Sequence, residues 1–235
     1  MIKFHSDVKR LLIQSLVLPL RQPQLFLHTP PIRHILLYGP PGTGKTMLAR
    51  SVAAQLSVPF LSVACSSLMT PYFGQSEAKI AALFTAANRL SEQSNQPCVV
   101  FFDEIDAVTR RRTDQEDEVT RRVKSELLRC MDGVERNNVF IFGCTNCPWD
   151  IDEAFLRRFK RRILIDLPSP AQSFHLLLRQ LTNSGLQLNQ SQADQIVERL
   201  VNYSGSDVDS VARMVKHYPL DELILAKEFH INDDG

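Results

Sequence analysis

The sequence predicts an α/β fold with a five-stranded parallel sheet flanked by helices, followed by a small all-helical domain. Three observations predict it: short apolar runs alternate with helical patterns, a glycine-rich loop joins the first run to a helix, and apolar runs stop at Pro168. Short continuous apolar runs are typical of strands that helices cover on both faces. Regular alternation with helices favours parallel pairing through right-handed crossovers. We therefore expect a large domain over residues 1–167 and a helical domain over residues 168–235.

The individual elements follow from the same patterns. The expected strands cover residues 34–38, 59–64, 98–103, 139–144 and 162–167. Helical patterns cover residues 46–56, 75–93, 116–134 and 152–159, and one more lies within residues 7–27. Pro168-Ser169-Pro170 ends the alternation, because proline cannot continue a paired strand. Helical stretches alone follow, at 171–183, 191–203, 206–217 and 220–227, with Ser191 and Ser206 as candidate N-caps.

Composition narrows the class of protein. The chain has 235 residues, 44% of them apolar and 23% charged, which is ordinary for a globular protein. Its net charge of +1 creates no overall field that would attract nucleic acid or membranes. No apolar run approaches the ~20 residues of a membrane-spanning helix, and the N-terminal sequence lacks the pattern of a signal peptide. We expect a cytoplasmic protein with no membrane insertion and no specific nucleic-acid partner.

Five cysteines are an odd number for a disulfide framework. Cys144 and Cys147 match a CxxC pattern, which occurs in redox pairs and in half of a zinc site. No second pair of cysteines has that spacing, and the motif follows a strand instead of opening a helix. Free thiols are therefore the expectation.

The glycine-rich loop carries the strongest chemical signal. Gly39-Pro40-Pro41-Gly42-Thr43-Gly44-Lys45-Thr46 fits the phosphate-binding pattern GxxxxGK[ST] between an expected strand and an expected helix. Glycines let successive N–H groups point at phosphate oxygens, and the helix N-terminus favours negative charge. Lys45 is expected to reach the β- and γ-phosphates, Thr46 to hold Mg²⁺, and Met47 to complete the nucleotide-binding set. The alternative is a Gly/Pro surface turn, which the length of the match disfavours.

Two carboxylates end the third strand. Asp103 and Glu104 follow four apolar residues at the carboxyl end of a buried strand, where parallel sheets bind ligands. Asp103 is expected to hold Mg²⁺, directly or through water, and Glu104 to orient or deprotonate the attacking water. The alternative is a pair of helix N-cap residues.

Asn146 lies just after the fourth strand, which is expected to lie between the strands of the two motifs above. Its amide could hold the attacking water or contact the γ-phosphate. The alternative is a turn-forming asparagine before Pro148.

Several strings together resemble the AAA ATPases. "GPPGTGKTMLA" (39–49), "FFDEIDAV" (101–108), "TNCPWDIDEAFLRRFKRR" (145–162) and "YSGSD" (203–207) occur in the order seen in that family. The chain looks like the clade of katanin, spastin, fidgetin and the ATPase that disassembles ESCRT polymers. It is most similar to the katanin catalytic subunit and its katanin-like paralogue. The resemblance covers residues 7–219.

The resemblance implies a ring, usually a hexamer, with ATP at the subunit interfaces. Arg157 and Arg158 fall on the arginine-finger positions; they can also be interpreted as a solvated basic patch or as a contact for RNA or acidic protein. Gly205 and Ser206 fall in the motif of the helical lid near the nucleotide. Tyr72 and Phe73 fall in the central-pore loop that grips a protein substrate, although Phe73 could equally belong to the core.

Three functions remain open. The first is a remodelling ATPase that draws a protein substrate through a central pore, best matched to microtubule severing, with tubulin as substrate and a cytoskeletal location. The second is a non-severing regulatory or truncated subunit in a ring with a full-length relative. It is suggested by Pro71 where relatives carry a basic residue, by Phe4 where their adenine-binding segment has glycine, and by an altered C-terminal end. The third is an ESCRT-type disassembly ATPase.

Overall fold

The computed structural model describes residues 6–26, 31–70, 74–111, 118–134, 138–181 and 190–225. Two compact units, Met1–Asp166 and Leu167–Gly235, divide the chain. The first opens with α1 (Ser6–Arg21), which contains Pro19, and the 3-10 helix η1 (Pro23–Phe26). Among the described helices, none is long and apolar enough to cross a membrane.

A parallel five-stranded sheet forms the centre of the first unit, which confirms the predicted fold class. Its strands are β1 (His34–Tyr38), β2 (Phe60–Ala64), β3 (Cys98–Asp103), β4 (Val139–Thr145) and β5 (Arg161–Leu164). The spatial order is β2-β3-β4-β1-β5, so β4 lies between β1 and β3 as expected. The predicted bounds of the last strand, 162–167, are wrong, because β5 covers Arg161–Leu164. Beyond Leu164, the N–H of Ile165 still donates to the oxygen of Tyr38 at 2.7 Å.

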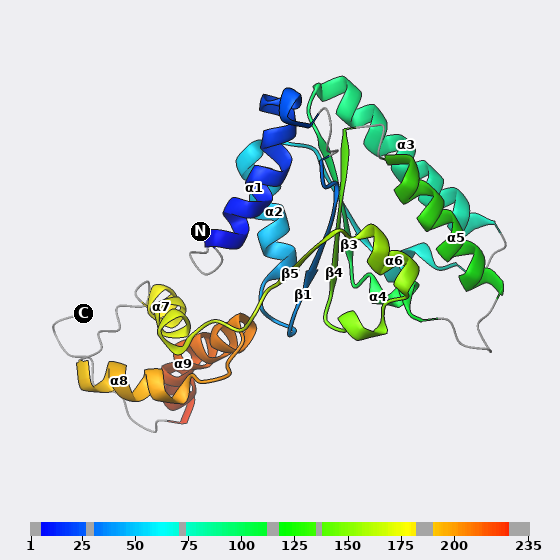
Figure 1. Cartoon of the computed structure of the whole chain (residues 1–235). Coiled ribbons are helices and arrows are strands. Elements are labelled where there is room, and N and C mark those ends of the chain that lie inside the picture. Colours follow the sequence, from blue (N-terminus) through cyan, green and yellow to red (C-terminus); the bar gives the residue numbers. More distant parts are fainter. Residues whose placement is uncertain are drawn as a thin grey trace. The chain divides into compact units, whose positions relative to one another are not determined.

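Helices cover both faces of the sheet (Figure 1). They are α2 (Lys45–Leu56), α3 (Gln75–Ser94), α4 (Asp106–Thr109), α5 (Glu118–Gly133) and α6 (Glu153–Arg158), with the 3-10 helices η2 (Cys65–Leu68) and η4 (Pro148–Asp150). α1 and α2 pack on one face, while α3 and α5 pack on the other. Side chains alternate between the two faces along β1: Ile35 and Leu37 pack on the face covered by α1 and α2, and Leu36 packs on the face covered by α3 and α5.

The central strands β3 and β4 are apolar except for Asp103 and Thr145 at their carboxyl ends, because both of their faces are covered. Every residue of β4 is buried, as are the first five of β3. Large buried rings fill the two layers: Phe101, Phe140 and Phe142 lie under α1 and α2, and Phe102 lies under α3 and α5. Such a core fixes the strand ends rigidly, and those ends carry the predicted chemistry.

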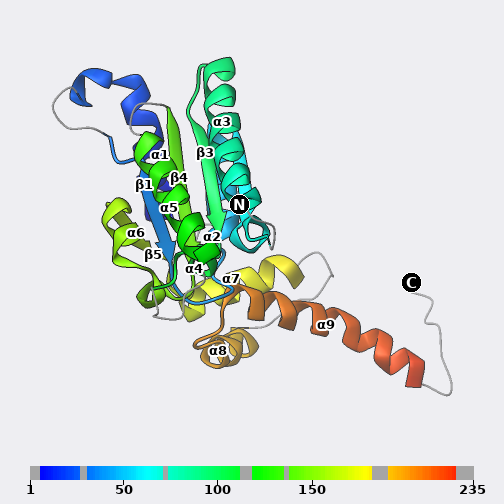
Figure 2. The same cartoon turned by 90° about the vertical axis from the view of Figure 1, so that its right-hand side faces the viewer.

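The second unit is helical and consists of α7 (Pro170–Leu181), α8 (Gln190–Arg199) and α9 (Gly205–Leu225) in its described part (Figure 2). Its small core contains Leu177, Leu181, Leu200, Val208 and Ala212. The predicted separation into helices 206–217 and 220–227 is wrong, since α9 runs through Pro219. Proline costs a helix one hydrogen bond, and the strong helix formers Leu220, Glu222 and Leu223 that follow it favour continuation of the helix.

The predicted N-caps of this unit are also misplaced. Ser204, not Ser206, precedes α9: its N–H donates to Asp207 Oδ2 at 2.8 Å, and the N–H of Asp207 donates to Ser204 Oγ at 3.3 Å. This reciprocal pair is a capping box. Ser191 lies inside the first turn of α8, which begins at Gln190.

Candidate active site

The phosphate-binding motif forms a tight loop between β1 and α2. Gly39, Gly42 and Gly44 have φ values of 145°, 73° and 86°, which side chains rarely tolerate. Gly44 is the N-cap of α2 and offers no side-chain acceptor to the first N–H groups of the helix. Uncapped N–H groups at a helix N-terminus form a binding site for phosphate. The geometry therefore fits a nucleotide phosphate chain.

Gly39 leaves no room for a side chain. A Cβ built there would lie 2.2 Å from the backbone oxygen of Ile165, just beyond β5. Replacing Gly39 with alanine should strain the loop by about 1–3 kcal/mol and weaken nucleotide binding by ~5–150-fold. Titration with a fluorescent ADP analogue measures the loss. Gly133→Ala is the matched control, because nothing lies within 4 Å of a Cβ at that position; equal affinities in the two variants would contradict the prediction.

Lys45 lies across the loop that it belongs to. Its Nζ donates to the backbone oxygens of Gly39 at 2.9 Å and Pro40 at 2.7 Å, and Thr43 Oγ1 also donates to Pro40, at 3.0 Å. Burial lowers the pKa of Lys45 below its usual range, and the negative charge of Asp103 opposes that shift. The ammonium is therefore held at the mouth of the loop, where phosphate oxygens can replace the carbonyls as acceptors.

The two predicted magnesium ligands meet in space. Thr46, in the first turn of α2, donates its hydroxyl to Asp103 Oδ2 at 3.0 Å, although the two residues are 57 positions apart in sequence. A hydroxyl and a carboxylate are hard oxygen donors of the kind that Mg²⁺ binds together with nucleotide phosphates. The donor set fits Mg²⁺.

Asp103 is held from its other side as well. Its Oδ1 accepts hydrogen bonds from the N–H of Glu104 at 3.1 Å and from Cys144 Sγ at 2.7 Å. Cys144 belongs to β4, and burial, followed by its bond to Asp103, raises the pKa of this thiol to about 12. The thiol is therefore a protonated donor at neutral pH. Sequence reasoning missed this contact, because it considered Cys144 only as half of a CxxC pair.

Glu104 is exposed and has a strained backbone. Its φ of 49° is left-handed, which costs a residue with a side chain about 1–2 kcal/mol. Strain of this kind is often kept at functional sites. The alternative role as a helix cap does not apply, since α4 begins after Ile105 and has no side-chain cap.

Asn146 directly follows β4, and its side chain is half-buried. Tyr38 and Thr145 are register partners, so the phosphate loop and Asn146 leave neighbouring strands at the same level. The turn at this point is made by Thr145, which donates to Asp106 Oδ1 at 2.6 Å and accepts the N–H of Cys147 at 2.9 Å. The amide of Asn146 makes no hydrogen bond to another described residue. Thr145, not Asn146, therefore performs the turn-forming role.

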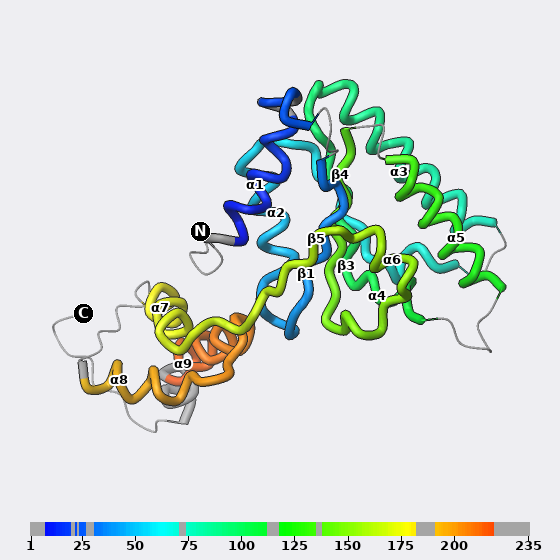
Figure 3. The backbone as a smooth tube through the Cα atoms, viewed as in Figure 1, coloured from blue at the N-terminus to red at the C-terminus, as the bar shows by residue number. Residues whose placement is uncertain are grey.

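Backbone contacts join the segment that follows β3 to the segment that follows β4. They lie between the end of α4 and the start of α6, which are both labelled in Figure 3. Arg110 and Ile151 form an antiparallel bridge, and the N–H of Asp152 donates to the oxygen of Thr109 at 2.7 Å. The buried Lys124 of α5 donates its Nζ to the oxygen of Arg110 at 2.6 Å. The segment after Glu104 is thereby tied to the segment that leads into α6.

The two arginines of α6 have different surroundings. Arg158 forms a bidentate ion pair with Asp132 of α5, with Nε–Oδ1 and Nη2–Oδ2 distances of 2.7 and 2.6 Å. Arg157 is 79% exposed, and its only contact with another described side chain is a long one of 3.4 Å with the equally exposed Glu153. Arg157 is therefore free to reach another molecule, whereas Arg158 is engaged within its own chain.

The remaining predicted residues belong to several elements. Met47 is 58% exposed in the first turn of α2. Gly205 and Ser206 form the start of α9 in the second unit. Cys144 and Cys147 are free thiols, and the described residues contain no cluster of three or more His, Cys, Asp or Glu side chains that could hold a metal ion. Tyr72 and Phe73 lie outside the described residues.

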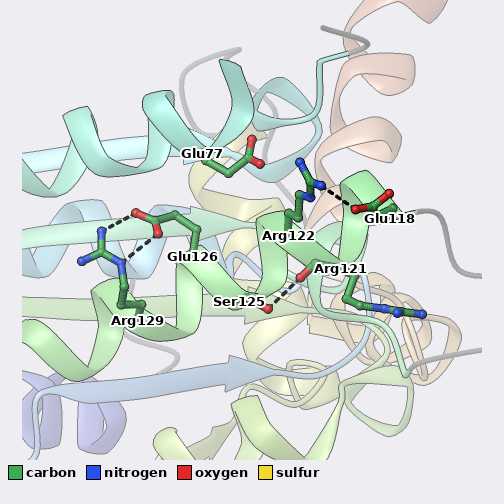
Figure 4. A pocket seen from close by; sticks show the side chains of 7 residues that line it. All are labelled: Glu77, Glu118, Arg121, Arg122, Ser125, Glu126 and Arg129. Atoms are coloured by element: carbon green, nitrogen blue, oxygen red, sulfur yellow. Dashed lines mark hydrogen bonds and ion pairs between the residues drawn. The ribbon is translucent and has the colours of Figure 1, made fainter. Parts of the chain in front are cut away.

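A charged hollow of about 540 Å³ lies elsewhere, between α3 and α5 (Figure 4). Arg122 pairs with Glu118, and Arg129 with Glu126, both within α5. The hydrogen bond from Arg129 lowers the pKa of Glu126. None of the predicted nucleotide-site residues lines this hollow, which is built from Glu77, Glu118, Arg121, Arg122, Ser125, Glu126 and Arg129.

The fold and the site together define a nucleoside triphosphatase of the phosphate-loop class. A family model described as "ATPase family associated with various cellular activities (AAA)" matches residues 35–167. The chain belongs to this family of ATPases.

Comparison with known proteins supports the same clade that the motifs indicated. The chain is 39% identical to spastin of Naegleria gruberi over 224 residues, 93% of this chain and 42% of that protein. Spastin of Sus scrofa is 38% identical over 219 residues, 92% of this chain and 35% of that protein. The chain thus spans well under half the length of these relatives. The solved FIGL-1 AAA domain has a TM-score of 0.81 and 32% identity, with 97% of this chain and 75% of that chain covered. A second structure of it, in complex with ADP, has a TM-score of 0.80 at the same identity, covering 93% and 72%.

Proposed function

We propose that the chain hydrolyses ATP as a subunit of a ring that remodels a protein substrate through a central pore. The observation that carries the proposal is the contact between Thr46 and Asp103 at the mouth of the phosphate loop, with Glu104 next in sequence. The residues proposed to bind phosphate and Mg²⁺ and to act as the base would thereby lie at the carboxyl ends of β1 and β3, the two strands that flank β4. Open parallel sheets bind ligands at such ends.

The residues divide the work by their chemistry. The loop residues Gly39–Thr46 and Met47 would bind the nucleotide, with Lys45 on the β- and γ-phosphates. Thr46 and Asp103 would hold Mg²⁺, which when bound neutralises charge on those phosphates. Glu104 would accept a proton from the attacking water, and Asn146 would hold that water or donate to the γ-phosphate.

Further residues would contribute once subunits assemble into a ring. Arg157 of one subunit would complete the site of its neighbour, since its guanidinium is exposed and, among the described residues, bonds only weakly to Glu153. A guanidinium supplied by a second molecule stabilises charge in the transition state. Gly205 and Ser206 would contribute from the helical unit, and Tyr72 and Phe73 would grip the substrate. The neighbouring subunit would be a second copy, in a hexamer, or a full-length relative.

Microtubules are the substrate that we propose, with a katanin-like severing activity and a cytoskeletal location. The support is the similarity to spastin and to FIGL-1, together with the string "PWDIDEA" (148–154), which resembles the katanin catalytic subunit. ATP turnover per subunit, measured against protein concentration with and without microtubules, tests the proposal. Turnover that rises cooperatively with concentration, and further with microtubules, is the expected result.

Other outcomes point to the alternatives. Turnover that appears only when a full-length relative is added would replace the proposal with a regulatory subunit. Stimulation by the helical tails of ESCRT subunits, but not by microtubules, would favour disassembly of ESCRT polymers. No turnover under any of these conditions would contradict hydrolysis by this chain.

A further inference from the structure

We propose that Cys144 is a positioning residue for Asp103 and Glu104, and that its thiol sets how strongly nucleotide binding depends on Mg²⁺. The inference rests on the proposed function, because it concerns the same magnesium ligands. It assigns a role to a side chain that neither the phosphate loop nor the acidic strand end contains.

Cys144 bonds to the residues on either side of Glu104, Asp103 and Ile105, in the turn after β3. Its Sγ lies 2.7 Å from Asp103 Oδ1, and its backbone oxygen accepts the N–H of Ile105 at 2.9 Å. Glu104 lies between these two anchors with its left-handed φ of 49°. A conformation that costs free energy persists only where its neighbours fix it, and Cys144 supplies a contact to each neighbour.

The thiol also determines which oxygen of Asp103 faces the metal ligand of α2. Oδ1 accepts from Cys144 and from the N–H of Glu104, while Oδ2 accepts from Thr46. Removing the thiol donor leaves Oδ1 with one of its two bonds, so the carboxylate gains freedom to rotate about its Cβ–Cγ bond. Mg²⁺ demands nearly ideal ligand geometry, and rotation of Asp103 therefore weakens the metal site and not the phosphate loop.

The surroundings explain why a thiol suits this position. Cys144 is 3% exposed and packs in the apolar cluster that contains Leu37, Leu48 and Phe142. Cysteine behaves there as a small apolar side chain that also carries a weak donor. Alanine would keep the packing roughly and lose the donor, whereas serine would keep a donor.

The test is a titration of the full chain with MgCl₂, starting from EDTA, while binding of a fluorescent ADP analogue is followed. Cys144→Ala should raise the Mg²⁺ concentration for half-maximal binding by ~2–10-fold, the effect of one lost hydrogen bond. Affinity in EDTA should stay as in the wild type. Cys144→Ser should restore the wild-type Mg²⁺ dependence. Cys144→Val, which lacks a donor and fills the site, should behave like Cys144→Ala and replaces it if that variant does not fold.

Cys98→Ala is the matched control, because Cys98 is a fully buried cysteine at the opposite end of β3. It should lower the melting temperature and leave the Mg²⁺ dependence unchanged. The inference is overturned if the Ala and Val variants of Cys144 match the wild type, or if Cys98→Ala shifts the Mg²⁺ dependence equally. Mg²⁺-independent binding by the wild type itself would overturn the proposed magnesium site, and this inference with it.

Discussion

Replacing Glu104 with glutamine should lower ATP turnover by ~10²–10⁴-fold, the usual contribution of a general base. The amide keeps the size of the side chain and loses the site that accepts a proton. Nucleotide affinity should remain, because no described contact of the phosphate loop involves the side chain of Glu104. Steady-state turnover and binding of a fluorescent ATP analogue measure the two effects separately.

A matched control tests whether loss of one negative charge elsewhere on the chain is enough to lower turnover. Glu92 is an exposed glutamate in α3, and Glu92→Gln should keep wild-type turnover. Unchanged turnover in Glu104→Gln would remove Glu104 from the mechanism. Loss of nucleotide binding in the same variant would show that Glu104 contributes to affinity, which the present assignment does not allow.

The fold could be predicted largely from the sequence because its cause is local. Apolar runs such as that of β3 are short, continuous and bounded, and each requires cover on both faces. The phosphate loop is equally local, since its glycines, Lys45 and Thr46 lie within eight consecutive residues, 39–46. The end of β5 was predicted wrongly because it depends on pairing with β1, which outweighs a local signal. The break at Pro219 was predicted wrongly because strong helix formers follow the proline and the helix continues.

The contacts that refine the site could not be predicted because they join distant positions. Cys144 meets Asp103 across 41 residues, and Arg158 meets Asp132 across 26. No periodic pattern encodes such pairs. The expected strand order put β3 beside β4 but did not fix their register, which sets the first pair; the second pair requires the position of α5 beside α6. The structure therefore separates two adjacent arginines that the sequence presents as equivalent.

That separation predicts different consequences for the two arginines. Arg157→Ala should lower turnover of the assembled ring by ~10³–10⁵-fold, as expected when a guanidinium supplied by a neighbour is lost. The stability of Arg157→Ala should be nearly that of the wild type, since Arg157 is exposed and its ion pair with Glu153 is long. Arg158→Ala should lower the melting temperature, because it breaks the tie between α6 and Asp132, a partly exposed pair worth up to ~1 kcal/mol. Thermal unfolding beside turnover distinguishes the two.

Mixing two inactive variants tests whether Arg157 acts on a neighbouring subunit. A subunit with Glu104→Gln retains Arg157, and one with Arg157→Ala retains Glu104. At an interface between them, the intact arginine meets the intact glutamate, so a mixture should hydrolyse ATP faster than either variant alone. The doubly substituted chain, Glu104→Gln with Arg157→Ala, is the control and should restore nothing when added to Arg157→Ala. A mixture no faster than its components would mean that Arg157 does not complete a neighbour's site, and catalysis would then have to rely on groups within one chain.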